Sequence, residues 1–175
     1  KFQSGDTTDV PPQSYWDLTL DLANTSINCG MQLDSIYGTI QLTGASNQQG
    51  IHCRGNLSLD SLMYEGTQFT QVHGPLWIDP SRVLFGSWAE TPRPDQPPQQ
   101  LSATVYGGTL RGNAQITLPE CQFKLMTSLS AADLTTIARE KIVPTSTLSG
   151  KTFANLNLSG VGKSHHTLRG NGMIR

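Results

Sequence analysis

The sequence predicts a mainly β protein with one short α-helix at about residues 131–142. Apolar and polar residues alternate along most of the 175 residues, with the period of two that a half-buried strand requires. Turn-forming residues, above all Gly and Pro, interrupt this alternation at the short intervals typical of antiparallel sheets. Only one stretch carries apolar residues at helical spacing. These observations together predict about ten strands and a single helix.

The strands are predicted where apolar residues recur at every second position. In the clearest strand, Leu110, Gly112, Ala114, Ile116 and Leu118 alternate with polar residues, so one face is apolar and the other polar. Similar runs occur from near the start of the chain to its end. Their apolar positions run, in chain order, from Trp16 to Leu22, Ile36 to Leu42, Cys53 to Leu59, Phe123 to Leu129, Ala154 to Leu158 and Leu168 to Ile174.

Two turn regions organise the middle of the chain. Residues 101–106 and 109–118 are expected to form an antiparallel hairpin, with Gly108 supplying the positive φ of a tight turn. The segment 91–100 contains four prolines and is expected to be a loop, because each proline removes a donor from a strand ladder.

The helix is predicted from capping residues as well as from spacing. Ser130 is the expected N-cap, with Asp133 three residues further on. Basic residues occupy the expected last turn, and Pro144 ends the helix. Its apolar face is expected to consist of Leu134, Ile137, Ala138 and Ile142.

The domain organisation is simple. Residues 1–14 form a polar N-terminal segment, and residues 15–175 are expected to form a single β-rich domain that includes the proline-rich loop. The chain begins without Met and ends on a predicted strand, so we expect it to be a section of a longer protein.

The composition excludes several classes of protein. Charged residues make up 14% of the chain and the net charge is -1, whereas an average globular protein has about 25% charged residues. Polarity comes instead from 16 Ser, 19 Thr, 8 Asn and 13 Gln. The absence of a basic excess argues against a nucleic-acid partner. The chain contains no run of about 18 apolar residues, so the sequence predicts no membrane-spanning helix.

No motif in the sequence predicts a catalytic site, a cofactor or a metal ion. Residues 149–152 (SGKT) resemble the end of a phosphate-binding loop, but the first Gly is missing and a strand follows. His165 and His166 are adjacent, so on a strand they would point to opposite faces. The acidic residues are scattered, and many precede turns. We therefore expect no enzyme activity, although distant acidic partners of a β-rich hydrolase fragment remain an alternative.

Aromatic and sulfur-containing residues leave further alternatives open. A sugar-stacking platform could be formed by Trp16, Trp77 and Trp88 with Tyr15, Tyr37, Tyr64 and Tyr106, but we favour roles as core anchors and in packing at strand ends. The three cysteines allow one disulfide with one free thiol, or three thiols.

An ordered set of segments resembles a known family. The segments are 105–112 (VYGGTLRG), 148–151 (LSGK), 154–162 (ANLNLSGVG) and 167–175 (TLRGNGMIR), preceded by 74–79 (GPLWID) and 83–86 (VLFG). In this order they are similar to the C-terminal region of the AsmA-like family, which includes TamB-type and bridge-like lipid transfer proteins of bacterial envelopes. The likeness covers residues 51–175.

The resemblance implies a curved antiparallel sheet, taco-like in section, whose apolar groove shields lipid acyl chains. It implies a non-enzymatic role in phospholipid transport and outer-membrane assembly. The expected location is the periplasm, with anchoring to a membrane through parts of the protein outside this chain. The expected partner is a phospholipid or another acyl lipid, and a disulfide between Cys29 and Cys53 is expected in that oxidising compartment. The residues expected to line the groove are Leu110, Ala114, Ile116, Leu118, Leu156, Leu158 and Ile174.

Two readings of the residues compete at this stage. The apolar strand faces must be buried by another sheet, by the helix or by a lipid, and the sequence leaves a closed sandwich and an open groove equally possible. The alternative function is a structural or carbohydrate-binding β module of a secreted or surface protein.

Overall fold

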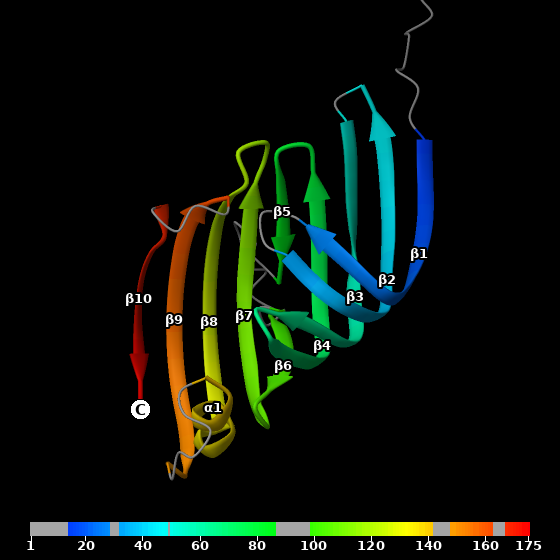
Figure 1. Cartoon of the computed structure of the whole chain (residues 1–175). Helices are drawn as coiled ribbons and strands as arrows, with labels where there is room; N and C mark the ends of the chain where they lie inside the picture. The colour runs from blue at the N-terminus through cyan, green and yellow to red at the C-terminus, as the bar shows by residue number, and fades with distance from the viewer. Residues whose placement is uncertain (1–13, 29–31, 49, 87–98, 142–147, 163–166) are drawn as a thin grey trace, which may run out of the picture.

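The computed structural model describes residues 14–28, 32–48, 50–86, 99–141, 148–162 and 167–175. It confirms the predicted fold class, because the described residues form one antiparallel sheet of ten strands and one short helix (Figure 1). All but one residue of the predicted N-terminal segment 1–14 lie outside this part of the chain, as do positions 91–98 of the predicted loop.

The strands follow one another across the sheet nearly in chain order. The spatial order is β1-β2-β3-β4-β5-β7-β8-β9-β10, and β6 pairs with β4 and β7. The bounds are β1 Ser14–Asn28, β2 Gln32–Asn47, β3 Gly50–Tyr64, β4 Thr67–Asp79, β5 Arg82–Phe85, β6 Leu101–Val105, β7 Gly108–Thr117, β8 Gln122–Asp133, α1 Leu134–Lys141, β9 Lys151–Val161 and β10 Arg169–Ile174.

Strands β5 and β6 are two halves of one interrupted strand. Both lie between β4 and β7, with β5 beside one end of these strands and β6 beside the other. On β7, Phe85 pairs with Ala114 and Leu101 pairs with Gly112, so a single residue of β7 separates the two halves. Strands β5 and β6 therefore share one strand position, although residues 86–100 separate them in the sequence.

The predicted β6–β7 hairpin is confirmed, but its turn lies one residue earlier than expected. The positive φ angles belong to Tyr106 (49°) and Gly107 (68°), as in a type I′ turn. Gly108 instead pairs with Val105 inside the ladder. A Cβ on Gly108 would lie 2.5 Å from the backbone nitrogen of Ala132, so glycine is needed there for close strand approach.

The helix is shorter than the predicted 131–142, and Ser130 is not its N-cap. Strand β8 continues past an irregularity at Ala131, where φ is 57°, and still pairs Asp133 with Lys151 of β9. The Ser130 hydroxyl donates to the backbone oxygen of Thr109 on the neighbouring strand. Asp133 is the cap: its carboxylate accepts a hydrogen bond from the backbone nitrogen of Thr135 at 2.9 Å.

Irregularities bend the N-terminal half of the sheet. Asn24, Ser35 and Gln71 have positive φ angles, and each lies at a register shift of β1, β2 or β4. Extra residues of this kind bend a strand, and Figure 1 shows β1 to β4 curving along their length. Beside the bends lies a core cluster of buried residues, namely Ile36, Leu59, Val72 and Ala103.

Candidate functional site

One face of the sheet is apolar across its whole width. Residues that pair directly across antiparallel strands point to the same face, so successive partners trace a row. The row that starts at Leu18 on β1 ends at Gly170 on β10. Its members are Leu18, Leu42, Gly55, Leu76, Phe85, Ala114, Leu125, Leu158 and Gly170. We call this side of the sheet the apolar face.

Three further rows belong to the apolar face. One row includes Trp16, Gly44, Cys53, Ile78, Val83, Ile116, Phe123 and Gly160. A second includes Leu20, Ile40, Leu57 and Gly74, and then Leu101, Gly112, Thr127, Leu156 and Gly172. A third includes Leu22, Gly38, Leu59 and Val72, and then Ala103, Leu110, Leu129, Ala154 and Ile174. None of these side chains carries a formal charge.

The opposite side, the polar face, takes up the uncharged polar residues that dominate the composition. One row of the polar face contains Asp17, Thr43, Arg54, Trp77, Leu84, Gln115, Lys124, Ser159 and Arg169. Another contains Asp21, Thr39, Ser58, His73, Ser102, Arg111, Ser128, Asn155 and Met173. The polar face thus holds most of the polar and charged residues of these rows, together with Trp77, Met173 and the buried Leu84.

The structure places six of the seven predicted groove residues on the apolar face. They are Leu110, Ala114, Ile116, Leu156, Leu158 and Ile174. Leu118 lies beyond the end of β7, where its backbone nitrogen donates to the oxygen of Ser81. Sequence reasoning missed the contribution of β1 to β5 to the same face. The alternation in those strands was visible, but only the pairing register joins them to the C-terminal strands.

Glycines on the apolar face lie under large side chains of neighbouring strands. A Cβ on Gly170 would lie 2.5 Å from Cδ2 of Leu158, and one on Gly160 would lie 2.9 Å from Cε1 of Phe123. The Trp16 ring covers Gly44 in the same way. The large side chains thus lie along the sheet, and the glycines allow the sheet to bend toward them.

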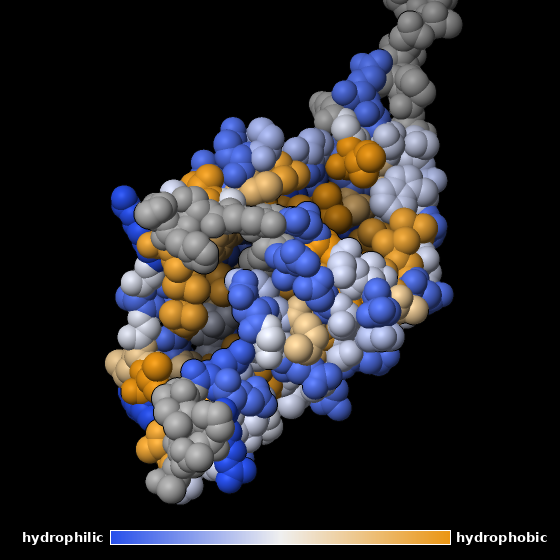
Figure 2. Space-filling view, in the orientation of Figure 1, coloured by the Kyte–Doolittle hydropathy of each residue, from blue (hydrophilic) through white to orange (hydrophobic). Residues whose placement is uncertain are grey.

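Only the middle of the apolar face is well buried. Leu57, Leu76 and Ile116 are buried, whereas Leu156 is 38% and Ile174 is 80% exposed. At the other edge, Leu18 and Leu20 are also exposed. Figure 2 shows apolar residues in a hollowed area over the right of the molecule, and others toward its left edge. The edges of the apolar face are therefore open to solvent.

The four described rows of the apolar face contain no histidine and no charged side chain. Their one cysteine, Cys53, has a free thiol, as has Cys121. Burial raises the pKa of the Cys53 thiol, so the thiol stays protonated at neutral pH. The expected Cys29–Cys53 disulfide involves Cys29, which lies outside the described residues.

The ion pair between Asp79 and Arg82 supports a turn. Burial alone would raise the pKa of Asp79, but hydrogen bonds from Ser81 and Arg82 lower it to about 2. The Asp79 carboxylate accepts from the Ser81 backbone nitrogen at 2.8 Å and from Arg82 Nε at 2.9 Å. These contacts close the β4–β5 turn. Within the described ranges, no group of three or more His, Cys, Asp and Glu residues is arranged to hold a metal ion.

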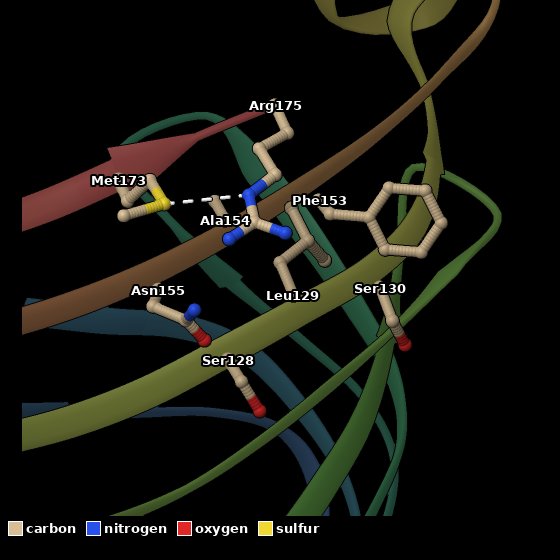
Figure 3. Close-up of a pocket in the computed structure, with 8 residues that line it drawn as sticks. All are labelled: Ser128, Leu129, Ser130, Phe153, Ala154, Asn155, Met173 and Arg175. Carbon is tan, nitrogen blue, oxygen red and sulfur yellow. Dashed lines mark hydrogen bonds between the residues drawn. The ribbon is translucent and has the colours of Figure 1, made fainter.

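The polar face carries a shallow hollow near the end of β10 (Figure 3). Its volume is about 470 Å³, and its lining includes Ser128, Ser130, Phe153, Asn155, Met173 and Arg175. The Arg175 guanidinium lies against the sulfur of Met173, with Nε 3.4 Å from Sδ. The adjacent histidines considered in the sequence, His165 and His166, lie outside the described residues.

The tryptophans do not share one role. Trp77 is exposed on the polar face between Arg54 and Leu84, so its interpretation as a core anchor is wrong. Trp16 lies on the apolar face, and Trp88 lies outside the described residues.

No known protein family, curated protein or solved structure matches the chain. In the part of the chain that the structure describes, no helix is long and apolar enough to cross a membrane.

Proposed function

We propose that the chain is a non-enzymatic segment of an AsmA-like protein of the bacterial envelope. Its apolar face forms a taco-like groove that shields lipid acyl chains during phospholipid transport and outer-membrane assembly. The segment acts in the periplasm, and other parts of the protein hold it to a membrane.

One observation carries this proposal: an apolar face runs through the whole sheet while its edges remain uncovered. Each apolar side chain of the size of Leu or Ile gains about 1.5–3 kcal/mol when it is fully buried. Ile174, 80% exposed, forgoes most of that gain, and Leu18, Leu20 and Leu156, which are 43%, 37% and 38% exposed, forgo part of it. A ligand that covers them would recover it.

The chemistry of the face favours an acyl chain as this ligand. A hydrocarbon chain offers no hydrogen bonds, and the rows of the apolar face contain no charged side chain that would require one. At one end of the sheet, α1 is held to the β3–β4 turn, where Lys141 Nζ donates to the backbone oxygen of Glu65. At the two edges of the sheet, Leu18, Leu20, Leu156 and Ile174 stay accessible.

Lipid extraction after purification from bacterial cells tests the proposal. We expect acyl lipids to co-purify with the chain and to appear as bound mass in native mass spectrometry. Leu156→Asp places a carboxylate on the apolar face at a half-exposed position, and should abolish binding without unfolding the sheet. Asn157→Asp, the next residue, places the same carboxylate on the polar face and should leave binding unchanged. Absence of lipid from the unaltered chain, or equal loss in both variants, would contradict the proposal.

A carbohydrate-binding β module is the second candidate function, and the exposed indole of Trp77 favours it. An exposed aromatic ring on a polar surface is suited to stacking against a sugar ring. Selective binding on a glycan array that Trp77→Ala abolishes would support this function. Unselective binding, or binding that survives the substitution, would exclude it.

A further inference from the structure

We propose that the β10 edge of one copy of this chain pairs in parallel with the β1 edge of a second copy. The pairing continues both the apolar and the polar face from copy to copy. This inference goes beyond lipid binding, because it rests on the two sheet edges and requires no lipid.

The two edges have matching strand directions. Eight antiparallel steps lead from β1 to β10, so the two edge strands run the same way. Copies stacked in one orientation would therefore add a parallel strand pair. The rows also end at corresponding levels, because Leu18 shares a row with Gly170 and Leu20 occupies the row that ends at Gly172.

The polar face supplies opposite charges at the same levels. Asp17 on β1 and Arg169 on β10 are the two ends of one row. Continuation of the rows therefore brings Arg169 beside Asp17 of the second copy. Unlike charges at neighbouring positions of two strands stabilise their pairing.

A second charge pair forms at the polar-face row that contains Asp21. Asp21 and Met173 are the two ends of that row. The Arg175 guanidinium folds back over Met173, with Nε 3.4 Å from Sδ (Figure 3). It therefore lies at the level where Asp21 of the second copy would arrive. Both edge arginines are exposed.

We infer that the partner is a second copy, because the acidic edge at β1 and the basic edge at β10 both belong to this chain. An edge strand is usually protected by a proline, a bulge or an inward-pointing charge. Strand β10, with the sequence RGNGMI, has no proline and no charge on the apolar face. Pairing would also cover the side chain of Ile174, which is the most exposed on the apolar face.

Sedimentation velocity over a range of protein concentrations, at low salt, tests the inference. The unaltered chain should form oligomers of increasing length as its concentration rises, and added salt should weaken them. Arg169→Glu or Asp17→Arg alone should weaken association by about tenfold or more, because like charges then meet. Asp17→Arg combined with Arg169→Asp exchanges the two charges and should restore association.

The matched control is Lys124→Glu, which makes the same change of charge in the same row but in the interior of the sheet. It should associate like the unaltered chain, and circular dichroism checks that each variant is folded. A chain that stays monomeric at all concentrations would overturn the inference. So would failure of the exchanged pair to restore association, or oligomers that resist both edge substitutions and disappear with Leu156→Asp.

Discussion

Leu76 and Trp77 are neighbours on β4, yet Leu76 is 5% exposed and Trp77 is 54% exposed. Leu76 belongs to the apolar face and pairs with Phe85, whereas Trp77 belongs to the polar face and pairs with Leu84. One step along the chain thus exchanges a core position for a solvent position. The larger side chain is the one that faces water.

This relationship predicts unequal effects of two truncations. Leu76→Ala should lower the free energy of unfolding by about 2–5 kcal/mol, because it leaves a cavity in the buried middle of the apolar face. Trp77→Ala should lower it by less than about 1 kcal/mol, as is usual for exposed positions. Urea unfolding of the two variants measures both values. A larger loss for Trp77→Ala would reverse the assignment of the faces.

Gly55 should not accept a larger residue. A Cβ at Gly55 would collide with the backbone oxygen of Gln41 on β2. Gly55→Ala should therefore cost about 2 kcal/mol or more, since backbone rather than a flexible side chain must move. Ser58→Ala, at an exposed position of the same strand, is the control and should be close to neutral. Equal melting temperatures for the two variants would show that β2 and β3 can separate locally without cost.

Two substitutions can distinguish Asp133 as the N-cap of α1 from Ser130, the N-cap that the sequence predicts. Asp133→Ala removes the acceptor of the Thr135 backbone nitrogen and should lower the melting temperature by several degrees. Ser130→Ala removes only a donor to a backbone oxygen in the sheet, and its effect should be smaller. A greater effect of Ser130→Ala would place the start of the helix before Asp133.

The stability of the fold should depend on pH through Asp79. Its pKa is lowered from 3.8 to about 2 in the folded chain. A lowered pKa means that the folded state favours the ionised form, so the stabilisation is complete above 3.8 and is lost as the pH falls toward 2. Asp79→Asn should be less stable than the unaltered chain at neutral pH, by about 1 kcal/mol. The difference should shrink between these two pH values, and a constant difference would contradict this account.

The period of two predicted the faces of single strands correctly, because the direction of successive side chains is a local property of extended backbone. It placed Leu156, Leu158 and Ile174 on one side of their strands, as the register confirms. It also predicted one short helix. The boundary of that helix was wrong, because the continued pairing of β8 with β9 depends on contacts distant in the sequence.

The extent of the candidate site could not be predicted in the same way. Joining Leu18 on β1 to Leu158 on β9 requires the register of every intervening strand pair. That register depends on bulges such as the one at Gln71, where a non-glycine residue adopts a positive φ that the sequence does not signal. The division of one strand position between β5 and β6 is invisible for the same reason. The polar residues that separate them read as an ordinary loop.

The interrupted strand gives the domain a natural place to accommodate foreign sequence. Phe85 and Leu101 are anchored on β7 on either side of one residue, Asn113, so the rows of both faces are fixed whatever the length of chain between them. A guest domain spliced between Phe85 and Leu101 would be joined to central strands and leave both edge strands as they are. Evolution can therefore lengthen or exchange this connection without disturbing the sheet, and an inserted fluorophore could report on its surroundings from a fixed central position.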